Sequence, residues 1–146
     1  MHFEGTVDIA APRERVWAFL IDPNQVGSCG PGVESIEVVD ETHYRARAKV
    51  GVGFITARFA VEMEMADKTP PERAVIKARG QAPGSAVDAI AEMRLSGQTD
   101  GPTTMTWTAD VSISGTIASV GARLIEGTAN KMIGQTFDCI RSRLEG

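Results

Sequence analysis

The segment Ala11–Val39, APRERVWAFLIDPNQVGSCGPGVESIEVV, constrains the fold most strongly because it places helices, a loop and a strand in a fixed order. Pro12 suits the first position of a helix, where its missing N–H has no hydrogen bond to lose. The apolar residues that follow lie on one helical face: Val16, Trp17 and Leu20. Asp22-Pro23 then interrupts this face, because the residue before a proline disfavours the helical conformation. The segment predicts a pair of short entry helices, a glycine-proline loop and a strand.

Apolar and polar residues alternate along most of the remaining chain, which predicts strands with one buried face each. Short turns separate these strands, as is typical of an antiparallel meander. A helical pattern from about Ile117 to Leu144 closes the chain. We therefore predict an α+β fold with a seven-stranded antiparallel sheet and one long terminal helix. The predicted strands are Phe3–Ala10, Val33–Val39, His43–Val50, Phe54–Ala66, Arg73–Gln81, Ala86–Ser96 and Thr103–Ser114.

The length and charge of the chain limit its organisation and its partners. A chain of 146 residues, 42% of them apolar, is long enough for one domain that buries roughly 68–70% of its unfolded surface. No linker or repeat divides it, so residues 1–146 are expected to form a single domain. Acidic residues exceed basic ones by 19 to 15, which gives a net charge of −4. Because no polybasic run is present, nucleic acid is not an expected partner.

The N-terminus and the cysteines bear on the cellular compartment. Met1 is followed directly by the first predicted strand, without the charged and apolar regions of a secretion signal. No stretch approaches the ~18 apolar residues of a membrane span. We therefore expect a cytoplasmic protein. Cys29 and Cys139 are few and lie in unlike contexts, so we expect reduced thiols.

Successive turns of an antiparallel meander fall at opposite ends of the sheet. One end receives ordinary polar turns: Asp40–Thr42, Asp67–Glu72 and Gln98–Pro102. The other end receives small, flexible or apolar segments: Gly51–Phe54, Gln81–Ala86, Ser28–Gly32 and the Gly115 junction. These segments either close hairpins only or form a portal, whose candidate residues are Cys29, Pro31, Val52, Phe54 and Pro83. Phe54 either stays exposed at this end or folds back over the core.

Many positions on the apolar faces carry small side chains, so a curved sheet facing one helix either leaves an apolar cavity or lets the helix approach closely. We predict the cavity, because Met residues beside Trp107 also suit an irregular ligand. The candidate ligand-binding residues are Tyr44, Ala48, Ala57, Phe59, Ile76, Ala78, Ala89, Ala91, Met93, Met105, Trp107, Ala109, Val120, Gly121, Leu124, Ile125 and Thr128.

Residue patterns for catalysis are mostly absent from the sequence. His2 and His43 are its only histidines, and neither has the spacing of a metal-ligand motif. Neither histidine lies in a segment that should reach Cys29, so a nucleophilic thiol lacks a base. No glycine-rich phosphate loop is present. Asp88, Glu92 and Asp110 alternate toward the outer face. We therefore expect no catalytic residue, metal or cofactor.

The start APRERVW, the stop DP, the C-x-P-G loop before the second strand and the terminal segment GARLIEGTANK together resemble one known family. The chain is similar over essentially its whole length to the CoxG-like proteins of carbon monoxide dehydrogenase systems. This resemblance implies the helix-grip fold of the START-like, Bet v 1-like superfamily: a curved antiparallel sheet around a long C-terminal helix. Two short helices lie between the first two strands of that fold.

The resemblance also implies a function. Proteins of this kind accompany molybdenum-containing carbon monoxide dehydrogenases and are associated with the inner face of the membrane, and their fold holds apolar small molecules. The expected ligand is an isoprenoid lipid such as a quinone. Some members continue in a long tail, whereas this sequence ends at Gly146, so we expect only transient membrane contact through the portal.

Two other functions remain open at this stage. One is a cofactor-independent cyclase or aromatase, which needs a polar group inside the cavity. The candidates for such a group are Tyr44, Glu34, Thr128 and Asn130. The other is an assembly factor for a molybdenum enzyme that acts through its surface.

Overall fold

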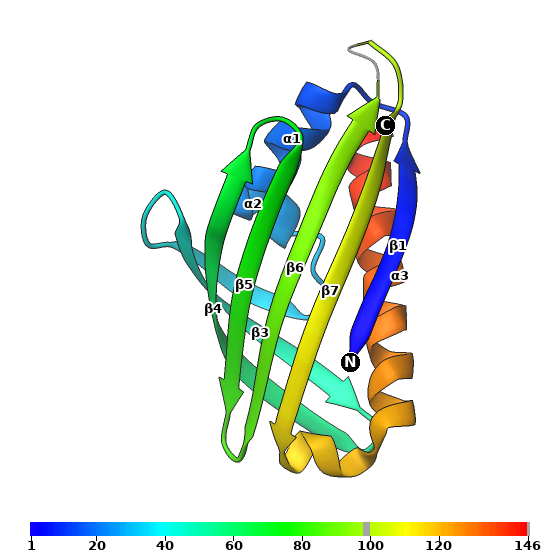
Figure 1. The fold of residues 1–146 in the computed structure, drawn as a ribbon. Coiled ribbons are helices and arrows are strands. Elements are labelled where there is room, and N and C mark those ends of the chain that lie inside the picture. Colours follow the sequence, from blue (N-terminus) through cyan, green and yellow to red (C-terminus); the bar gives the residue numbers. More distant parts are fainter. Residues whose placement is uncertain (98–99, 146) are drawn as a thin grey trace.

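A curved sheet, two short helices and one long helix make up the computed structural model, which describes residues 1–97 and 100–145 (Figure 1). The elements in chain order are β1 (His2–Ile9), α1 (Arg13–Ile21), α2 (Pro23–Gly27), β2 (Val33–Val38), β3 (His43–Val52), β4 (Ile55–Thr69), β5 (Arg73–Ala82), β6 (Ser85–Gly97), β7 (Thr103–Gly115), a 3₁₀ helix η1 (Thr116–Val120) and α3 (Ala122–Glu145). The predicted seven strands are confirmed, although several ends differ by a few residues.

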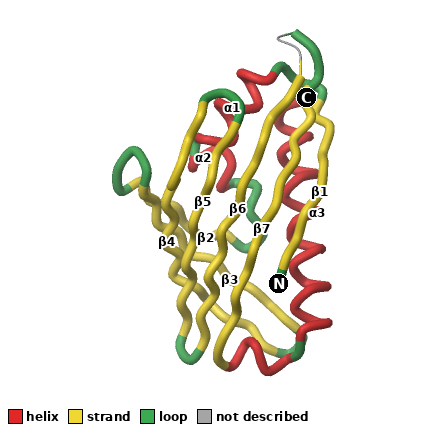
Figure 2. The backbone as a smooth tube through the Cα atoms, viewed as in Figure 1, coloured by secondary structure: helices red, strands yellow, loops and turns green. Residues whose placement is uncertain are grey.

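All the strands form one antiparallel sheet in the order β1-β7-β6-β5-β4-β3-β2 (Figure 2). Consecutive strands from β2 to β7 are neighbours, and β1 joins the sheet beside β7. Residues 10–32 between β1 and β2, which include α1 and α2, therefore connect the two edges of the sheet. The predicted α+β fold, a curved sheet around a long C-terminal helix with two short helices after the first strand, is confirmed.

The entry helices form where the sequence predicts them, with one difference at the start. Pro12 is not the first residue of α1 but the extended residue just before it, with ψ of 148°. Asp22 separates the two helices, and its side chain accepts a hydrogen bond from the backbone N–H of Asn24 at 3.0 Å. Hydrogen bonding, chiefly from the Gln25 side chain, lowers the pKa of Asp22. The N-cap therefore stays charged at neutral pH and fixes the start of α2.

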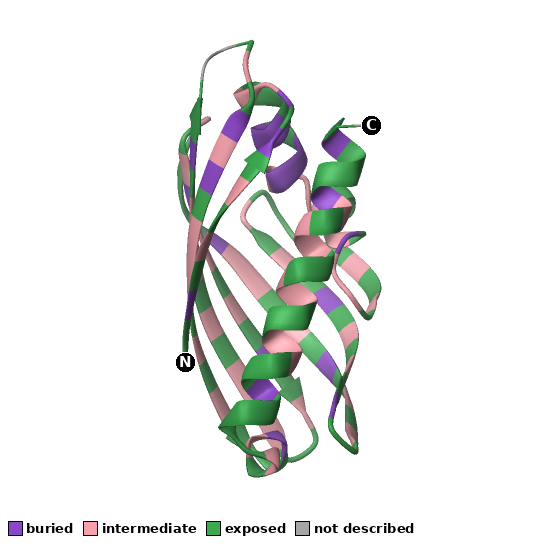
Figure 3. Cartoon of the chain, turned by 90° about the vertical axis from the view of Figure 1, so that its right-hand side faces the viewer, coloured by how far each residue is buried: buried purple, intermediate pink, exposed green. Residues whose placement is uncertain are grey.

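The terminal helical region is broken, whereas the sequence predicted one helix from about Ile117. The η1 turn ends at Gly121, whose φ of 99° favours glycine, and α3 begins at the next residue. Figure 3 shows α3 crossing the face of the sheet, with exposed residues along its outer side. The break lets Ile117 turn into the core while α3 takes a separate direction.

The two ends of the sheet differ in what covers them. We call closed end the end that carries α1 and the turns after β2, β4 and β6, and portal end the end that carries the turns after β3 and β5 together with η1. Figure 1 shows the closed end at the top and the portal end at the bottom. This alternation of turns agrees with the predicted meander, although Gln98 and Thr99 of the predicted turn Gln98–Pro102 lie outside the described residues.

The Ser28–Gly32 loop is not at the portal end, where the sequence placed it. The Gly32 carbonyl accepts a hydrogen bond from the Lys49 backbone N–H at 2.8 Å, which holds the loop partway along β3. Cys29 is buried among closed-end side chains. The meander rule failed here because a connection that carries two helices does not obey the geometry of a hairpin turn.

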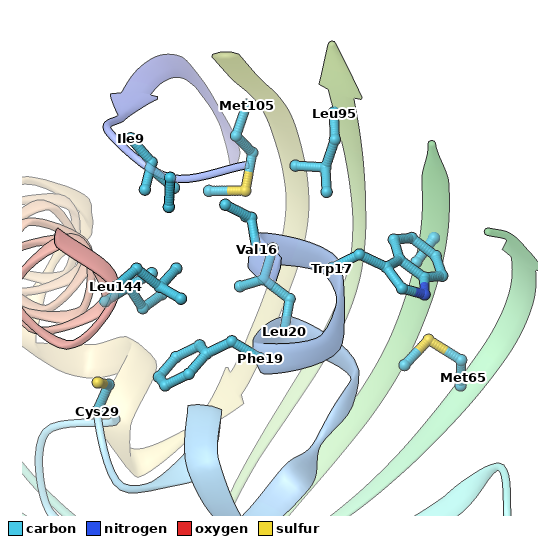
Figure 4. Close-up of a cluster of buried hydrophobic side chains, with 13 residues drawn as sticks. Ile9, Val16, Trp17, Phe19, Leu20, Cys29, Met65, Leu95, Met105 and Leu144 are labelled. Carbon is cyan, nitrogen blue, oxygen red and sulfur yellow. The ribbon is translucent and has the colours of Figure 1, made fainter. Parts of the chain in front are cut away.

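The buried side chains form two clusters, one at each end. The closed-end cluster joins α1, the last turns of α3 and the sheet, and Figure 4 shows its labelled members gathered between these elements. Its buried residues are Ile9, Ala11, Val16, Trp17, Phe19, Leu20, Cys29, Met65, Ala74, Leu95, Met105, Ile140 and Leu144. The portal-end cluster has fewer buried residues: Val52, Phe59, Ile117 and Ile125. Space therefore remains between sheet and helix at the portal end.

Candidate functional site

An apolar chamber of about 300 Å³ lies between the portal-end half of the sheet and the start of the terminal helical region. We call it the portal chamber. Four of its sheet positions carry the smallest side chains: Ala48, Ala78, Gly80 and Ala89. Because these side chains do not reach α3, the space between the two layers stays unfilled. The other residues around it are Val50, Val52, Phe59, Val61, Val87, Val111, Ile113, Ile117, Ile125, Thr128, Ala129 and Met132.

A second apolar chamber, of about 280 Å³, lies between α2 and the β2–β5 part of the sheet. We call it the α2 chamber. Ala48 and Val61 line both chambers, so the two adjoin along β3 and β4. Each volume is near the lower end of the range for small-molecule sites, about 300–1,000 Å³. A ligand with a long apolar chain fits this arrangement better than a compact polar one.

Polar side chains are scarce inside both chambers. Thr128 is the one polar side chain among the described residues that line the portal chamber, and Tyr44 is its counterpart in the α2 chamber. The Tyr44 hydroxyl donates a hydrogen bond to the Glu41 carbonyl at 3.0 Å. Burial, followed by the charges of Asp40 and Asp22, raises the pKa of Tyr44, so its hydroxyl stays neutral. The chambers therefore recognise their contents by shape and apolar contact.

Some of the predicted ligand-binding residues meet at the chambers. Those that line one or both chambers are Tyr44, Ala48, Phe59, Ile76, Ala78, Ala89, Ile125 and Thr128. Ala57 packs against the portal-end cluster without lining a chamber. Val120, Gly121 and Leu124 instead line a shallow depression on the outer side of α3. The predicted helical face was rotated because the break at Gly121 separates these residues from Ile125.

The remaining predicted ligand-binding residues lie away from the chambers. Met105 is buried in the closed-end cluster, and Met93 and Trp107 pack against it. The Trp107 ring lies 5.4 Å from that of Phe137 on α3, and no described chamber reaches Ala91 or Ala109. These positions share the chamber's face of the sheet, but α1 and the second half of α3 fill the space in front of them.

The α2 chamber was not predicted from the sequence. Its walls include Gly27 and Gly30 on the α2 side and Ile36 on β2. A side chain added at Gly27 would overlap Ile36, so glycine is what permits this close approach. The signal was present in the sequence as two glycines opposite the small residues Ala46 and Ala48 of β3.

The five predicted portal residues do not share one environment. Phe54 is 91% exposed, so it does not fold back over the core, whereas Val52 is 3% exposed and belongs to the portal-end cluster. Pro83 is exposed in the β5–β6 turn. Cys29 is buried near the closed end, and Pro31 is half-buried in the adjacent loop. Only Phe54 and Pro83 therefore lie exposed at the portal end.

The expectation of reduced thiols is wrong in this structure. Cys29 and Cys139 form a disulfide with a Cα–Cα distance of 5.4 Å across a sequence separation of 110 residues. The bond joins the loop after α2 to the second half of α3, next to Phe19 and Leu144 of the closed-end cluster (Figure 4). Unlike contexts in the sequence did not reveal the pairing, because only the tertiary fold brings the two segments together.

The charged groups lie outside the chambers. A shallow groove of about 820 Å³ crosses the outer face of the sheet, and its charged side chains include His2, Lys77 and Asp88. Many of them pair with one another: Arg79 with Asp88 at 3.5 Å, Arg45 with Glu62 at 3.8 Å and His2 with Asp110 at 2.8 Å. The predicted outward direction of Asp88 and Asp110 is confirmed. This groove is a solvated sheet surface and offers no apolar site.

Neither histidine belongs to a catalytic arrangement. Hydrogen bonds to Asp110 and Asp40 raise the pKa values of His2 and His43, respectively, and both side chains are on the exposed surface. Within residues 1–97 and 100–145, no group of three or more His, Cys, Asp or Glu side chains is arranged to hold a metal ion.

The candidate polar groups of a cyclase are also displaced from the chambers, with one exception. Glu34 forms an ion pair with Arg58 at 3.2 Å, and Asn130 is exposed on α3. Tyr44 is bonded to a carbonyl, and Thr128 alone faces a chamber without an acid or base beside it. Acid-base chemistry on a bound molecule therefore has no evident pair of groups among the described residues.

Comparisons with known proteins identify relatives of this chain. Residues 5–145 match the model of the carbon monoxide dehydrogenase family CoxG. A conserved protein from Geobacillus kaustophilus is similar in structure, with 25% identity, a TM-score of 0.91, and coverage of 99% of this chain and 95% of that one. No curated protein sequence matches the chain.

Two further solved structures share the fold at lower identity. The Zhui aromatase/cyclase from a Streptomyces species has 18% identity and a TM-score of 0.74, with coverage of 99% and 93% of the two chains. A START superfamily protein from Mycobacterium smegmatis has 11% identity and a TM-score of 0.74, with coverage of 99% and 97%. Family and fold together support a ligand-binding fold. Within the described residues, no helix is both long and apolar enough to cross a membrane.

Proposed function

The chain belongs to the CoxG family of carbon monoxide dehydrogenase proteins, and from this premise and its two apolar chambers we propose that it is a non-enzymatic lipid-binding protein. Its ligand is the apolar chain of an isoprenoid lipid such as a quinone. By holding that lipid, the protein couples a molybdenum-containing carbon monoxide dehydrogenase to the membrane at its inner face.

The observation that carries the proposal is the composition of the chamber walls. Apart from Thr128, every described residue around the portal chamber is apolar or glycine. An isoprenoid chain needs no hydrogen bond, and each CH₂ group that leaves water contributes about 0.8 kcal/mol to binding. A polar head group has no partner deep inside and would remain at the mouth of the chamber.

The proposal assigns the dehydrogenase as partner through the family, and it assigns the quinone through chemistry. An oxidoreductase that delivers electrons to a membrane pool needs access to a lipid-soluble carrier. A chamber of apolar side chains outside a bilayer supplies an environment for the chain of that carrier. The surface that contacts the dehydrogenase is separate from this argument.

A cyclase or aromatase activity is the second candidate, because one structural neighbour is described as an aromatase/cyclase. Such a reaction needs groups that move protons on the bound substrate. Tyr44 and Thr128 are the hydroxyls nearest the chambers, and Tyr44 is already bonded to the Glu41 carbonyl. Lipid binding without turnover therefore has more support. An assembly factor that acts through its surface would need neither chamber.

Filling the portal chamber tests the proposal. The Ala89→Leu variant should bind a quinone with a short isoprenoid chain about tenfold more weakly or worse, because the added methyl groups displace ligand atoms from the chamber. Ala60→Leu makes the same change on the exposed outer face of β4 and is the matched control. Native mass spectrometry of the gently purified protein reports the bound lipid, and quenching of tryptophan fluorescence reports the affinity. Equal affinities of the parent and both variants would contradict the proposal.

A further inference from the structure

The tip of the β3–β4 hairpin presents an aromatic side chain to the outside of the molecule. Phe54 is 91% exposed, at a position where turns ordinarily carry polar residues. Leu124 of α3 is 47% exposed, and its Cδ1 atom lies only 3.4 Å from the place of a Cβ on Gly53. Two large apolar side chains from distant parts of the sequence therefore stand together at the portal end.

Basic side chains surround this apolar tip. Arg123 and Lys131 line a depression of about 530 Å³ on the outer side of α3, together with Leu124, Gly127 and Thr128. Thr128 also lines the portal chamber, so the depression adjoins the chamber across α3. Within residues 1–97 and 100–145, no carboxylate oxygen lies within 4.0 Å of a side-chain nitrogen of either cation. Both cations are therefore available to an external anion.

The portal end also lacks acids along the chain. Residues 46–61, 79–87 and 111–125 contain no Asp or Glu, and their cations are Arg47, Lys49, Arg58, Arg79 and Arg123. The acids nearest to them are Glu34, which pairs with Arg58 at 3.2 Å, and Glu126 on α3. The whole chain, in contrast, has a net charge of −4. The positive charge at this end is therefore local and lies against the overall balance.

We propose that the portal end docks on a membrane surface that contains anionic phospholipid. Phe54 and Leu124 enter the acyl-chain boundary, and Arg123 and Lys131 bind the phosphate groups around them. This orientation points the portal chamber at the layer from which an isoprenoid lipid would enter. The proposal names the membrane surface for the lipid-binding function inferred above and rests on it for its purpose, but docking is measurable without a bound ligand.

Charge complementarity selects this occupant over two others. A second copy of the chain would bring its own cations against Arg123 and Lys131, which repel one another. A dehydrogenase partner would need an acidic surface with a pocket for Phe54, whereas a bilayer with anionic lipid supplies negative charge and an apolar layer together.

Flotation of the protein with vesicles tests the proposal. The probes are vesicles of phosphatidylcholine alone and vesicles in which phosphatidylglycerol replaces one third of it, each at low and high salt. The parent should bind the anionic vesicles at low salt, and binding should fall at high salt because the head-group contacts are screened. The Arg123→Gln/Lys131→Gln variant should bind about 25-fold more weakly, since each removed cation accounts for about fivefold. Phe54→Ser should lose about tenfold or more, through lost apolar burial.

Matched variants remove the same groups elsewhere. Arg15→Gln/Lys68→Gln removes two exposed cations from the closed end, and Ile90→Ser removes an exposed apolar side chain from the outer face of the sheet. Both should bind vesicles like the parent. Equal losses in these variants, or no binding of the parent to anionic vesicles, would overturn the proposal. Binding of the parent to a dehydrogenase that Phe54→Ser abolishes, without any vesicle binding, would assign the tip to a protein partner and overturn it as well.

Quinone binding in dilute detergent separates this proposal from the lipid-binding function. Phe54→Ser and Arg123→Gln/Lys131→Gln leave the chamber walls intact, so both variants should bind the short-chain quinone like the parent. Vesicle binding without quinone binding would leave the docking surface standing and contradict the proposed function. Quinone binding without vesicle binding would do the reverse.

Discussion

The closed end and the portal end use the same sheet in opposite ways. At the closed end, β6 and β7 carry large side chains such as Leu95 and Met105, and α1 and the last turns of α3 cover them. At the portal end the same two strands carry Ala89 and Val111, which face a chamber. The difference teaches that stability and ligand capacity are allotted to separate halves of one layer.

Polar chemistry follows the same division. The closed end has the Cys29–Cys139 disulfide, and the buried Thr103 hydroxyl donates a hydrogen bond to the Ala11 carbonyl at 2.7 Å. Its turns contain acids such as Asp40 and Asp67, both with hydrogen-bonded carboxylates. The portal end has glycine-containing turns instead, and its surface carries the two cations of the depression on α3. The closed end therefore holds the fold together, while the portal end is left free to exchange a ligand.

Truncating an isoleucine on each half of α3 should give the largest contrast in stability. Ile140→Ala removes a side chain that is 2% exposed in the closed-end cluster and should lower the free energy of unfolding by about 2–5 kcal/mol. Ile125→Ala should cost at least about 1 kcal/mol less, because one side of Ile125 already faces the portal chamber and has fewer packed neighbours. Denaturant unfolding measures both values. Equal losses would mean that the portal end is packed as tightly as the closed end.

Removing the disulfide should weaken the closed end by a similar amount. The bond closes a loop of about 110 residues, and loss of a disulfide typically costs about 2–4 kcal/mol. A reductant should therefore lower the melting temperature of the parent. The Cys29→Ala/Cys139→Ala variant is the control, because a reductant should leave its melting temperature unchanged. Two titratable thiols in the native, unreduced protein would contradict this prediction.

Enlarging an alanine should distinguish the two ends with a smaller effect. Ala74→Leu adds volume at a fully buried position of the closed-end cluster and should cost about 1–3 kcal/mol. Ala89→Leu adds the same volume beside the portal chamber and should cost less than about 1 kcal/mol, because the side chain enters existing space. Thermal unfolding of the two variants without ligand measures the difference. The comparison would fail if Ala89→Leu were as destabilising as Ala74→Leu.

The smallest expected effect is a pH dependence at the closed-end turn between β2 and β3. Hydrogen bonds from the Thr42 backbone N–H and the His43 side chain lower the pKa of Asp40 from 3.8 to about 2. A lowered folded-state pKa contributes stability above pH 3.8, and this contribution is lost as the pH falls through about 2. The hydrogen bond with Asp40 raises the pKa of His43 above 6.5, so the contribution of His43 is present below pH 6.5 and is lost as the pH rises through the raised value.

The Asp40→Asn variant should therefore be less stable than the parent mainly between about pH 4 and 6.5. The difference in melting temperature should shrink as the pH falls toward the lowered pKa of Asp40. Glu41→Gln, at the neighbouring exposed position, is the control and should not reproduce this pH profile. A difference that does not change with pH would show that Asp40 acts in this turn through geometry alone.

Local patterns were enough to predict most of the fold. Alternation with a period of two identified all seven strands, because side chains of a strand point to opposite faces whatever covers them. Asp22-Pro23 located the boundary between the entry helices for the same reason, since proline and a capping carboxylate act on their own neighbours. The break at Gly121 was missed, although a glycine at this position is a local signal of the positive φ found there.

The candidate site was predicted less well. The sequence placed Ala89, Met93 and Trp107 on one face, but it did not state what lies opposite each of them. Ala89 lines the portal chamber, whereas Met93 and Trp107 meet packed side chains. Val52 and Phe54 are two residues apart in a turn, yet one is buried and the other is 91% exposed. Turn geometry, rather than residue type, separates the two.

The sequence by itself determined the family, the strands and the apolar face of each strand, because these depend on short-range spacing and on motifs near one another in the chain. The tertiary structure alone decided which half of that face is packed, because α1 and α3 reach it from distant segments. It also decided that Cys29 meets Cys139, 110 residues away. Contacts between distant segments depend on how whole elements pack against one another, and the alternation of residues within a strand carries no information about them.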